Sequence, residues 1–308
     1  MHDEHCNDTD NRFGRTSELR LKATARDGVT AVPELYASMP FKVMHAFDVR
    51  EGDLPGYERL ASRDDARRAL AAPKQLVVMS VSAGIMAGDR QELTVDVEPG
   101  AALSMTTQAF EKIHRMEDGE HAARRARIHV GKGAYLDYRP LPQTPFAASS
   151  FSTDTVIELA DASSHVAYEE ILSCGRVARG ERFAYRDYRS HVRVTCADAP
   201  VFIDNTIYRP SSTDMEGLGF YGSYSHLANL VLVNLDIDDT RFSAIRDYLQ
   251  SQTGEIGAGA AAPVSDAPAE DAIAGGITRL ATGDCLVKLL GHRAQRLQDV
   301  LKQVRDLV

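Results

Sequence analysis

The sequence lacks the features that mark several common protein classes. Its four cysteines are widely spaced and form no CxxC pair, so a disulfide framework is not expected; they are Cys6, Cys174, Cys196 and Cys285. No apolar run approaches the roughly 20 residues of a membrane-spanning helix. The polar N-terminus also lacks the apolar core of a secretory signal. These absences predict a cytoplasmic protein with reduced thiols and no membrane association.

A surplus of basic residues is also missing. The chain has 35 lysines and arginines against 44 aspartates and glutamates, a net charge of −9. Nucleic-acid binders usually carry a basic stripe, so no nucleic-acid partner is expected. The 44% hydrophobic and 26% charged residues suit a globular protein with a substantial core. The balance is typical of a protein that meets other proteins or handles cations.

Catalytic motifs are scarce as well. No GxxxxGK[ST], GxSxG or HExxH occurs, and the ten histidines are scattered. We therefore expect no enzymatic activity and no permanently bound cofactor. A β-rich hydrolase or isomerase stays an alternative, because triads cannot be recognised from sequence order. His2, His5 and Cys6 form a metal-like cluster, but they lie in a polar tail over residues 1–16 that is predicted to be disordered, which favours adventitious binding.

What the sequence has in abundance is period-two alternation, which indicates β-strands. Apolar residues alternate from Leu19 to Ala25, and Asp27-Gly28 then predicts a hairpin turn. Residues 76–81 are apolar at nearly every position, which predicts a central strand covered on both faces.

Three similar segments follow turns and begin at Gly100, Gly133 and Ser163, 33 and 30 residues apart. They predict a weak repeat of one hairpin per unit. We expect an all-β, mainly antiparallel fold with an elongated, solenoid-like body of stacked hairpins. An ordinary β-sandwich stays open as the alternative. If the units stack, Thr107 and Glu170 lie at one rim of the sheet.

The C-terminal third predicts two late α-helices. One begins at Asp239 or Thr240, and the other covers about 293–307 with an apolar stripe on one face. Between them, residues 254–272 are rich in Gly, Ala and Pro and predict a mobile insertion. The chain is thus expected to form a single β domain over 17–308.

Glu170 is unusual because period two places it on the same face as Val166, Tyr168 and Leu172. A carboxylate on an apolar face costs several kcal/mol unless it is paired, hydrated or bound to a cation. Two interpretations stay open: an internal ion pair, with Arg176 for example, or a carboxylate that lines a wet internal passage.

Several ordered blocks resemble the urease accessory proteins of the UreD family, also called UreH. The similarity covers about residues 17–308 outside the insertion. The blocks are Ala83 to Asp89, Met105 to Gln108 with Lys112, Tyr138 to Pro142, and Glu170 to Arg176 with Gly180 to Phe183. Ala83, Ala87 and Glu111 depart from the family pattern.

The resemblance implies an elongated β protein with a pair of helices. It also implies binding to the urease apoprotein and to UreF, recruitment of the GTPase UreG through UreF, a dimer of heterodimers with UreF, and help in nickel delivery. Asp89 and Glu170 are the candidate carboxylates of a transient Ni²⁺ passage, because oxygen ligands hold nickel weakly enough for transit. A scaffold without a metal path stays an alternative. The other motif positions are candidates for structural or partner-binding roles: Gly84, Gly88, Thr106, Thr107, Gln108, Lys112, Tyr138, Pro142, Gly175, Arg176 and Glu181.

Gly88-Asp89 also suits a simple turn, since both residue types favour turns. Thr106, Thr107 and Gln108 also suit hydrogen-bonding roles at a strand edge. Gly175 and Arg176 also suit a bulge and an internal ion pair.

Overall fold

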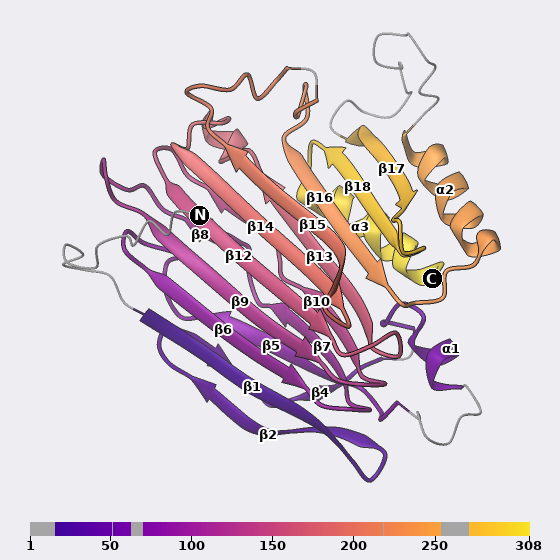
Figure 1. Ribbon diagram of the computed structural model, residues 1–308. Coiled ribbons are helices and arrows are strands. Elements are labelled where there is room, and N and C mark those ends of the chain that lie inside the picture. The colour runs from indigo at the N-terminus through magenta and orange to yellow at the C-terminus, as the bar shows by residue number, and fades with distance from the viewer. Residues whose placement is uncertain (1–15, 51, 63–69, 218, 254–270) are drawn as a thin grey trace.

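The computed structural model describes residues 16–50, 52–62, 70–217, 219–253 and 271–308. The predicted tail and nearly all of the predicted insertion lie outside these ranges. Within them, two β-sheets pack face to face and helices lie beside one of the sheets (Figure 1). The predicted all-β class, the stacked arrangement and the late helices are confirmed.

Sheet A has seven strands and forms the front layer in Figure 1. In spatial order these are β15 (Ala199–Tyr208), β14 (Asp187–Cys196), β12 (Ser150–Leu159), β9 (Ala122–Val130), β6 (Arg90–Val97), β1 (Thr16–Arg26) and β2 (Val29–Ala37). The predicted hairpin turn at Asp27-Gly28 joins β1 to β2 and is confirmed.

Sheet B has eleven strands. Its main order is β17 (Ile273–Arg279), β18 (Cys285–Gly291), β16 (His226–Val233), β13 (His165–Ser173), β10 (Tyr135–Arg139), β7 (Ala102–Thr107), β5 (Lys74–Ser80) and β3 (Phe41–Val43). Three short strands attach to it: β4 (Phe47–Asp48), β8 (Glu111–Ile113) and β11 (Gln143–Pro145).

Strand direction differs from the prediction. The neighbours β1, β6, β9, β12 and β14 run parallel in sheet A, as do β5, β7, β10 and β13 in sheet B. Antiparallel pairs occur toward the margins, such as β14–β15 and β13–β16. The expected mainly antiparallel, one-hairpin unit is therefore wrong. Each repeat unit instead contributes one strand to sheet A and the following strand to sheet B. The turn between these two strands is a corner, where the chain passes from one sheet to the other.

The predicted repeat appears directly in the strand register. Ala102 pairs with Tyr135, and Tyr135 pairs with His165, so the three segments lie side by side. Their corners also bond to one another: the Gly133 N–H donates to Ser163 Oγ at 2.9 Å, and Ser164 Oγ donates to the Gly131 carbonyl at 2.9 Å. This register places the ends of β7 and β10 at the same rim of sheet B as the second half of β13, as predicted for Thr107 and Glu170.

The strand predicted at residues 76–81 is covered on only one face. Leu76 and Val78 are buried in β5, whereas Val77 and Met79 are partly exposed. The expected coverage of both faces is wrong, because β5 lies near the margin of sheet B.

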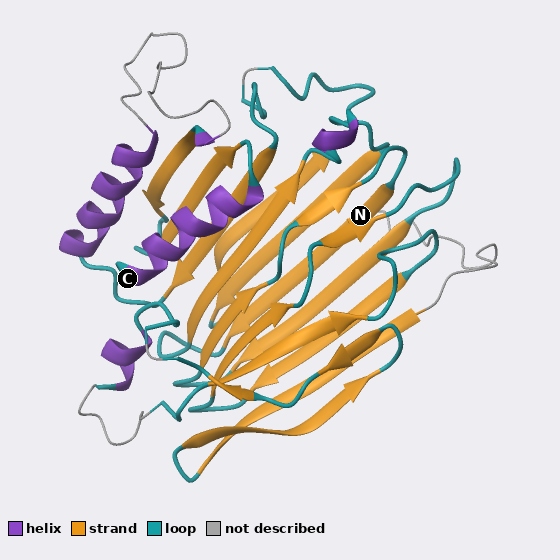
Figure 2. Cartoon of the chain, turned by 180° about the vertical axis from the view of Figure 1, so that it is seen from behind, coloured by secondary structure: helices purple, strands orange, loops and turns teal. Residues whose placement is uncertain are grey.

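Both predicted helices are present, as α2 (Asp239–Thr253) and α3 (Ala294–Asp306). They lie on the outer side of sheet B (Figure 2). The short α1 (Tyr57–Ala61) and a 3₁₀ turn (Val177–Arg179) were not expected. Among the described residues, none of the helices combines the length and apolarity needed to cross a bilayer.

Apolar side chains form separate clusters on the two sides of sheet B. One fills the space between the sheets and includes Leu19, Met105 and Val231. Another lies under α2 and α3 and includes Leu230 and Leu297. Because each buried side chain of this kind contributes about 1.5–3 kcal/mol, these clusters dominate the stability of the fold. Polar groups between the sheets are therefore the exceptions that require an explanation.

We expect the folded protein to lose stability in acid because one histidine is largely buried. His226, at the start of β16, has a pKa lowered to about 4, chiefly by burial and further by nearby His292. The unfolded chain, with its ordinary histidine pKa of 6.5, takes up the proton first. The contribution of His226 to stability is therefore complete above about pH 6.5 and falls by about 3 kcal/mol as the pH drops toward 4.

Urea unfolding of His226→Gln across this pH range should show a flatter pH dependence than that of the wild type. The exposed His129→Gln serves as control, and an unchanged slope in His226→Gln would contradict the assignment.

Candidate functional site

A recess opens between the sheets where β5 and β7 end, and we call it the Thr107 cavity. It encloses about 890 Å³ of space, including its open mouth. Six of the predicted motif residues line it: Gly84, Thr106, Thr107, Gln108, Lys112 and Tyr138. The rest of its wall is largely apolar and includes Phe41, Met79 and Leu141. The structure thus brings together residues that are far apart in the sequence.

The motif residues at the rim hold the backbone in place. Thr106 Oγ1 donates to the Arg139 carbonyl at 2.8 Å, and Thr107 Oγ1 accepts the Leu141 N–H at 2.9 Å. Gly84 has φ = 144°, and a Cβ there would lie 2.4 Å from the Lys112 carbonyl oxygen. Only glycine fits this close approach. These contacts support the strand-edge interpretation of both threonines.

A buried ion pair closes the back of the Thr107 cavity. Arg124 on β9 donates to Glu111 on β8, and its Nε donates to Gln91 Oε1 at 2.9 Å. Arg124 is only 8% exposed, so an unpaired guanidinium would be costly there. Glu111, a departure from the family pattern, supplies the compensating charge.

Tyrosines link this cavity to a second one. Tyr138 lines the Thr107 cavity, and its ring lies 5.6 Å from that of Tyr168. The Tyr168 hydroxyl donates to Glu170 Oε2 at 2.9 Å. Burial raises the pKa of both phenols, so they are neutral donors at physiological pH. Tyr138 and Tyr168 therefore connect the Thr107 cavity to Glu170 through one ring contact and one hydrogen bond.

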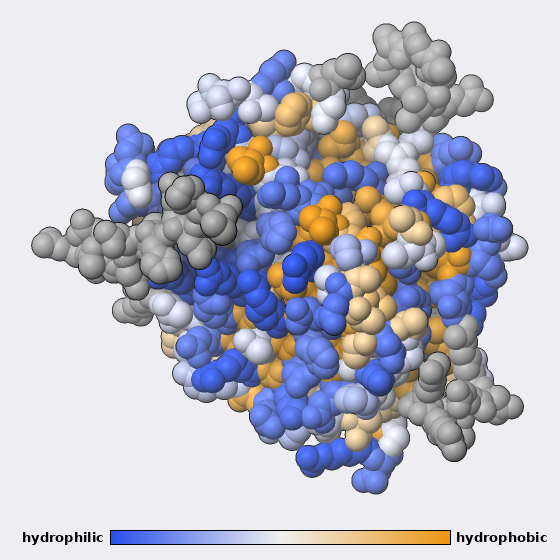
Figure 3. Space-filling view, viewed as in Figure 1, coloured by the Kyte–Doolittle hydropathy of each residue, from blue (hydrophilic) through white to orange (hydrophobic). Residues whose placement is uncertain are grey.

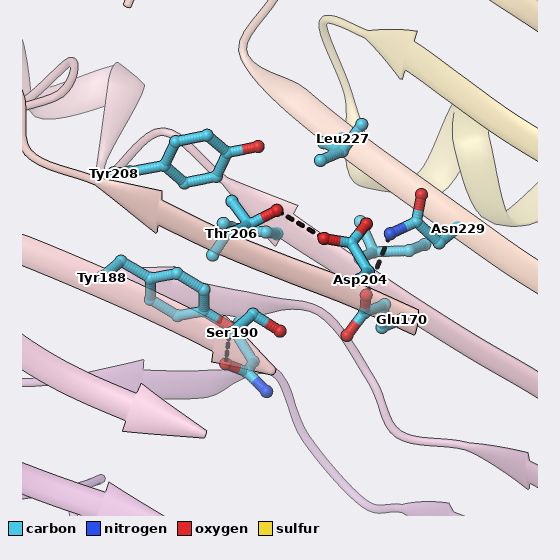
Figure 4. A pocket seen from close by; sticks show the side chains of 11 residues that line it. Glu170, Tyr188, Ser190, Asp204, Thr206, Tyr208, Leu227 and Asn229 are labelled. Atoms are coloured by element: carbon cyan, nitrogen blue, oxygen red, sulfur yellow. Dashed lines mark hydrogen bonds between the residues drawn. The ribbon is translucent and has the colours of Figure 1, made fainter. Parts of the chain in front are cut away.

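The second recess, which we call the Glu170 cavity, encloses about 400 Å³ including its mouth. It lies between β13 and β16 of sheet B and β14 and β15 of sheet A (Figure 4). Glu170 Oε1 accepts a hydrogen bond from Asn229 Nδ2 at 2.9 Å. Burial raises the pKa of Glu170, the Asn229 and Tyr168 hydrogen bonds oppose that shift, and nearby Asp204 adds to it.

Glu170 does not form the ion pair proposed as one interpretation. Arg176 instead pairs with Glu181, and its guanidinium lies 3.9 Å from the centre of the Phe146 ring. In the described part of the chain, no lysine or arginine lies within ion-pair distance of Glu170. The hypothesis of a Glu170–Arg176 pair is wrong, and the Glu170 carboxylate is instead held by hydrogen bonds from Tyr168 and Asn229.

Gly175, Arg176 and Glu181 form a local structural unit after β13. A Cβ on Gly175, whose φ is 133°, would lie 2.2 Å from the Glu181 carbonyl oxygen. Glu181 Oε2 accepts the Ala147 N–H at 3.1 Å, and its bond to Arg176 lowers the Glu181 pKa. Pro142 has a similar supporting role, since its carbonyl accepts the Glu111 N–H at 2.9 Å.

Gly88 and Asp89 lie in a turn before β6, outside the walls of both cavities. Gly88 has φ = 78°, and Asp89 Oδ2 accepts the Met86 N–H at 2.8 Å. These contacts suit the turn interpretation. The structure therefore does not bring Asp89 together with Glu170 at one cavity.

Sequence reasoning missed several interior polar residues. Asp204 lies on β15 on the same face as Phe202 and Thr206. The opposite face is the more apolar one in the sequence, with Val201, Ile203 and Ile207, so the period-two rule would have placed Asp204 toward solvent. Asn229 is the single polar residue within the apolar run of β16 after His226. Arg124 gave the same signal as Glu170, because alternation in β9 places it on the face of Ala126 and Ile128.

The outer face of sheet A is mostly hydrophilic (Figure 3) and carries a serine–histidine–aspartate group. His121 lies 3.0 Å from Ser150 Oγ and 2.9 Å from Ser152 Oγ, and Ser150 donates to Asp187 at 2.7 Å. The carboxylate thus bonds a serine and not the imidazole. Because β12 is paired on both sides, its N–H groups are used within the sheet and provide no oxyanion hole. This group does not favour the hydrolase alternative.

A glycine spacing of the GxGxxG type occurs at Gly217, Gly219 and Gly222. It lies between β15 and β16, and a strand follows it where a dinucleotide-binding motif requires a helix. This glycine spacing therefore does not support binding of a dinucleotide cofactor.

The fold and site define a two-sheet, solenoid-like β protein with polar residues buried between its sheets. The model of the UreD urease accessory protein family matches residues 15–308. A urease accessory protein UreD of Acetivibrio thermocellus is 29% identical over 298 residues, 97% of this chain and 99% of the relative. A UreH of Helicobacter pylori is 34% identical over 249 residues, 80% and 84% of the two chains. A UreD of Actinobacillus pleuropneumoniae is 30% identical over 291 residues, 94% and 95%.

The chain belongs to the UreD family of urease accessory proteins, and its role is in urease maturation.

Proposed function

We propose that this chain is a cytoplasmic scaffold that binds the urease apoprotein and UreF and recruits UreG through UreF. In this function it forms a dimer of heterodimers with UreF, and it helps pass nickel toward the urease active site. It performs no catalysis of its own and holds no permanent cofactor. Membership of the urease accessory family supports the proposal, as do the accessory names of the relatives.

The observation that carries the nickel step is the environment of Glu170. Its carboxylate lies between the sheets, is held by Tyr168 and Asn229, and has no cationic side chain paired with it in the described chain. A buried carboxylate of this kind attracts a cation. Oxygen donors bind Ni²⁺ more weakly than thiolates or several imidazoles, which suits transit and not storage. That Asp89 is a second carboxylate on the nickel route stays a prediction.

The test separates transport from scaffolding. Glu170→Gln keeps the shape of the side chain and removes its charge. In cells that express the whole urease system, urease activity and nickel per urease should fall on the order of tenfold, the size of effect seen when metal-site partners are removed. Glu158→Gln, on the exposed outer face of β12, is the matched control and should leave both unchanged.

Co-purification with UreF and urease completes that experiment. The proposal expects complexes of normal yield with Glu170→Gln. If activity and nickel content stay normal while the complexes form, the chain is a scaffold without a metal path. If the complexes themselves are lost, the loss of urease activity comes from failed assembly and not from a nickel step at Glu170.

A further inference from the structure

One edge of sheet A is open. β15 is the last strand in the order of sheet A and pairs only with β14. Among the described residues, no backbone hydrogen bond outside that pairing involves residues 201–208. In an antiparallel pair, every other residue of an edge strand directs its N–H and C=O groups away from its partner. β15 therefore presents a row of unpaired backbone groups.

The opposite edge of sheet A is protected against a further strand, whereas β15 is not. β2 contains Pro33 near its middle, and proline has no N–H group to donate to another strand. β15 has a proline only at its second position, Pro200, which pairs with Thr195 beside an irregularity in the register. From Val201 to Tyr208 no proline interrupts the edge. A long edge of this kind is typical of a surface that pairs with another chain.

Exposed apolar side chains lie along the same strand. Ile203 is 56% exposed and Ile207 is 48% exposed. They alternate with Asp204 and Thr206, which line the Glu170 cavity, so both isoleucines lie on the outer face of sheet A. That face is otherwise mostly hydrophilic (Figure 3). Apolar side chains beside unpaired backbone groups are typical of a surface that a partner covers.

A recess continues this edge on its inner side. It encloses about 760 Å³ including its mouth, and it lies between the end of β15 and the strands β17 and β18 of sheet B. Its wall includes Tyr208, Phe220, Ala274 and Leu290. In Figure 1, β17 lies beyond β15, and sheet A has no further strand to cover it. The recess is therefore the space that side chains of an added strand would enter.

Gly276 on β17 leaves room for an approaching backbone. Gly276 pairs in register with Lys288, and Lys288 reaches Asp204 of sheet A at 3.4 Å, so both residues face the side of sheet A. Nothing lies within 4 Å of a Cβ added at Gly276. Glycine within a strand often marks a close approach by another backbone. Lys288 lines the recess with its side chain 48% exposed, which favours an acidic residue on the approaching chain.

We propose that β15 and this recess bind an extended segment of a partner protein, which adds to sheet A as a further strand. Unpaired groups along a strand edge pair with extended chain, so a helix does not fit there. The inward side chains of the segment are apolar, apart from an acidic residue near Lys288, and its outward side chains cover Ile203 and Ile207. This inference deepens the proposed scaffold function and rests on it for the partner, a protein of the urease system.

A second copy of this chain does not fit the edge. Antiparallel pairing of two β15 strands about a two-fold axis places both copies of sheet B on the same side of the joined sheet. Because β17 projects beyond β15 in each copy, the two copies of sheet B would collide. A single extended segment brings no second sheet and meets no such obstacle.

Hydrogen exchange tests the added strand in the full chain. Amide exchange of residues 201–208 is measured in the free chain, in its complex with UreF and in its complex with the urease apoprotein. We expect the outward-directed amides of β15 to exchange about tenfold more slowly, or slower still, in one of these complexes, because the added strand accepts their hydrogen bonds. The amides of β2, at the opposite edge of sheet A, should exchange at the same rate in all three samples.

Two substitutions should weaken that complex by about tenfold while the chain stays folded. Ile203→Lys places a charge on the exposed edge, and Gly276→Val fills the recess with a residue that strands favour. Leu35→Lys is the matched control, because Leu35 is 43% exposed on β2. It should bind the partner as the wild type does. Urea unfolding should show equal stability in the three variants.

Unchanged exchange of residues 201–208 in both complexes overturns the added strand, and so does wild-type affinity in both Ile203→Lys and Gly276→Val. Either result leaves the scaffold function intact, since the complexes still form. Slower exchange that depends on the concentration of the free chain identifies a second copy as the occupant and overturns the choice of a partner segment. If the wild-type chain binds neither UreF nor urease, the proposed function fails and this inference fails with it.

Discussion

Replacing Arg305 by methionine should lower the free energy of unfolding by about 3–5 kcal/mol. Arg305 lies on α3 and is 5% exposed, and it pairs with Asp137 on β10, which is 0% exposed. Its guanidinium also lies 3.7 Å from Glu169 on β13. Without Arg305, two buried carboxylates on the outer face of sheet B lose their compensating charge. Urea unfolding at neutral pH measures the loss.

The matched control is Lys302→Met on the same helix. Lys302 pairs with Asp306 in an exposed i,i+4 contact, which contributes less than about 0.5 kcal/mol. Burial raises the pKa of Glu169, and Arg305 opposes that rise. The Arg305→Met loss should therefore shrink as the pH falls and Glu169 takes up a proton. A loss under about 1 kcal/mol at neutral pH would refute the structural role of this ion pair.

Gly175→Ala should be the other severe substitution, with a loss of about 3 kcal/mol or more. Its φ of 133° lies in a region that residues with a Cβ rarely adopt, and the added carbon would meet the Glu181 carbonyl at 2.2 Å. The loop that carries Arg176 and Glu181 would have to move. The yield of soluble protein and urea unfolding both measure the effect.

Gly180→Ala is the control within the same loop. Gly180 also has a positive φ, 75°, but nothing lies within 4 Å of an added Cβ. The expected loss is about 1 kcal/mol, from backbone strain alone. Equal losses at Gly175 and Gly180 would mean that the close approach to Glu181 does not contribute.

Several elements of the fold could be predicted because their signals are local. The apolar stripe of Leu297, Val300, Leu301 and Val304 predicted α3, and all four side chains are buried. The hairpin at Asp27-Gly28 followed from turn chemistry. Strand direction could not be predicted, because turns with glycine and proline, such as Pro99-Gly100, serve equally as hairpins and as corners between sheets.

The candidate site, too, could be predicted from the sequence only in part. Glu170 could be recognised because alternation along one strand places it among apolar residues. Its surroundings could not, since Asn229 and Asp204 reach it from strands far along the chain. Asp89 was chosen from a motif, yet its carboxylate bonds the local turn at Met86.

The sequence by itself determined the β class, the repeat register, both long helices and the family, because alternation, helical periodicity and ordered motifs are properties of neighbouring residues. Only the tertiary structure decided that the central strands of both sheets run parallel, that Arg176 pairs with Glu181, and that Asp204 and Glu170 line one cavity from opposite sheets. Those outcomes depend on contacts between distant segments, and the free energy of burying a charge is set by whatever the fold brings beside it.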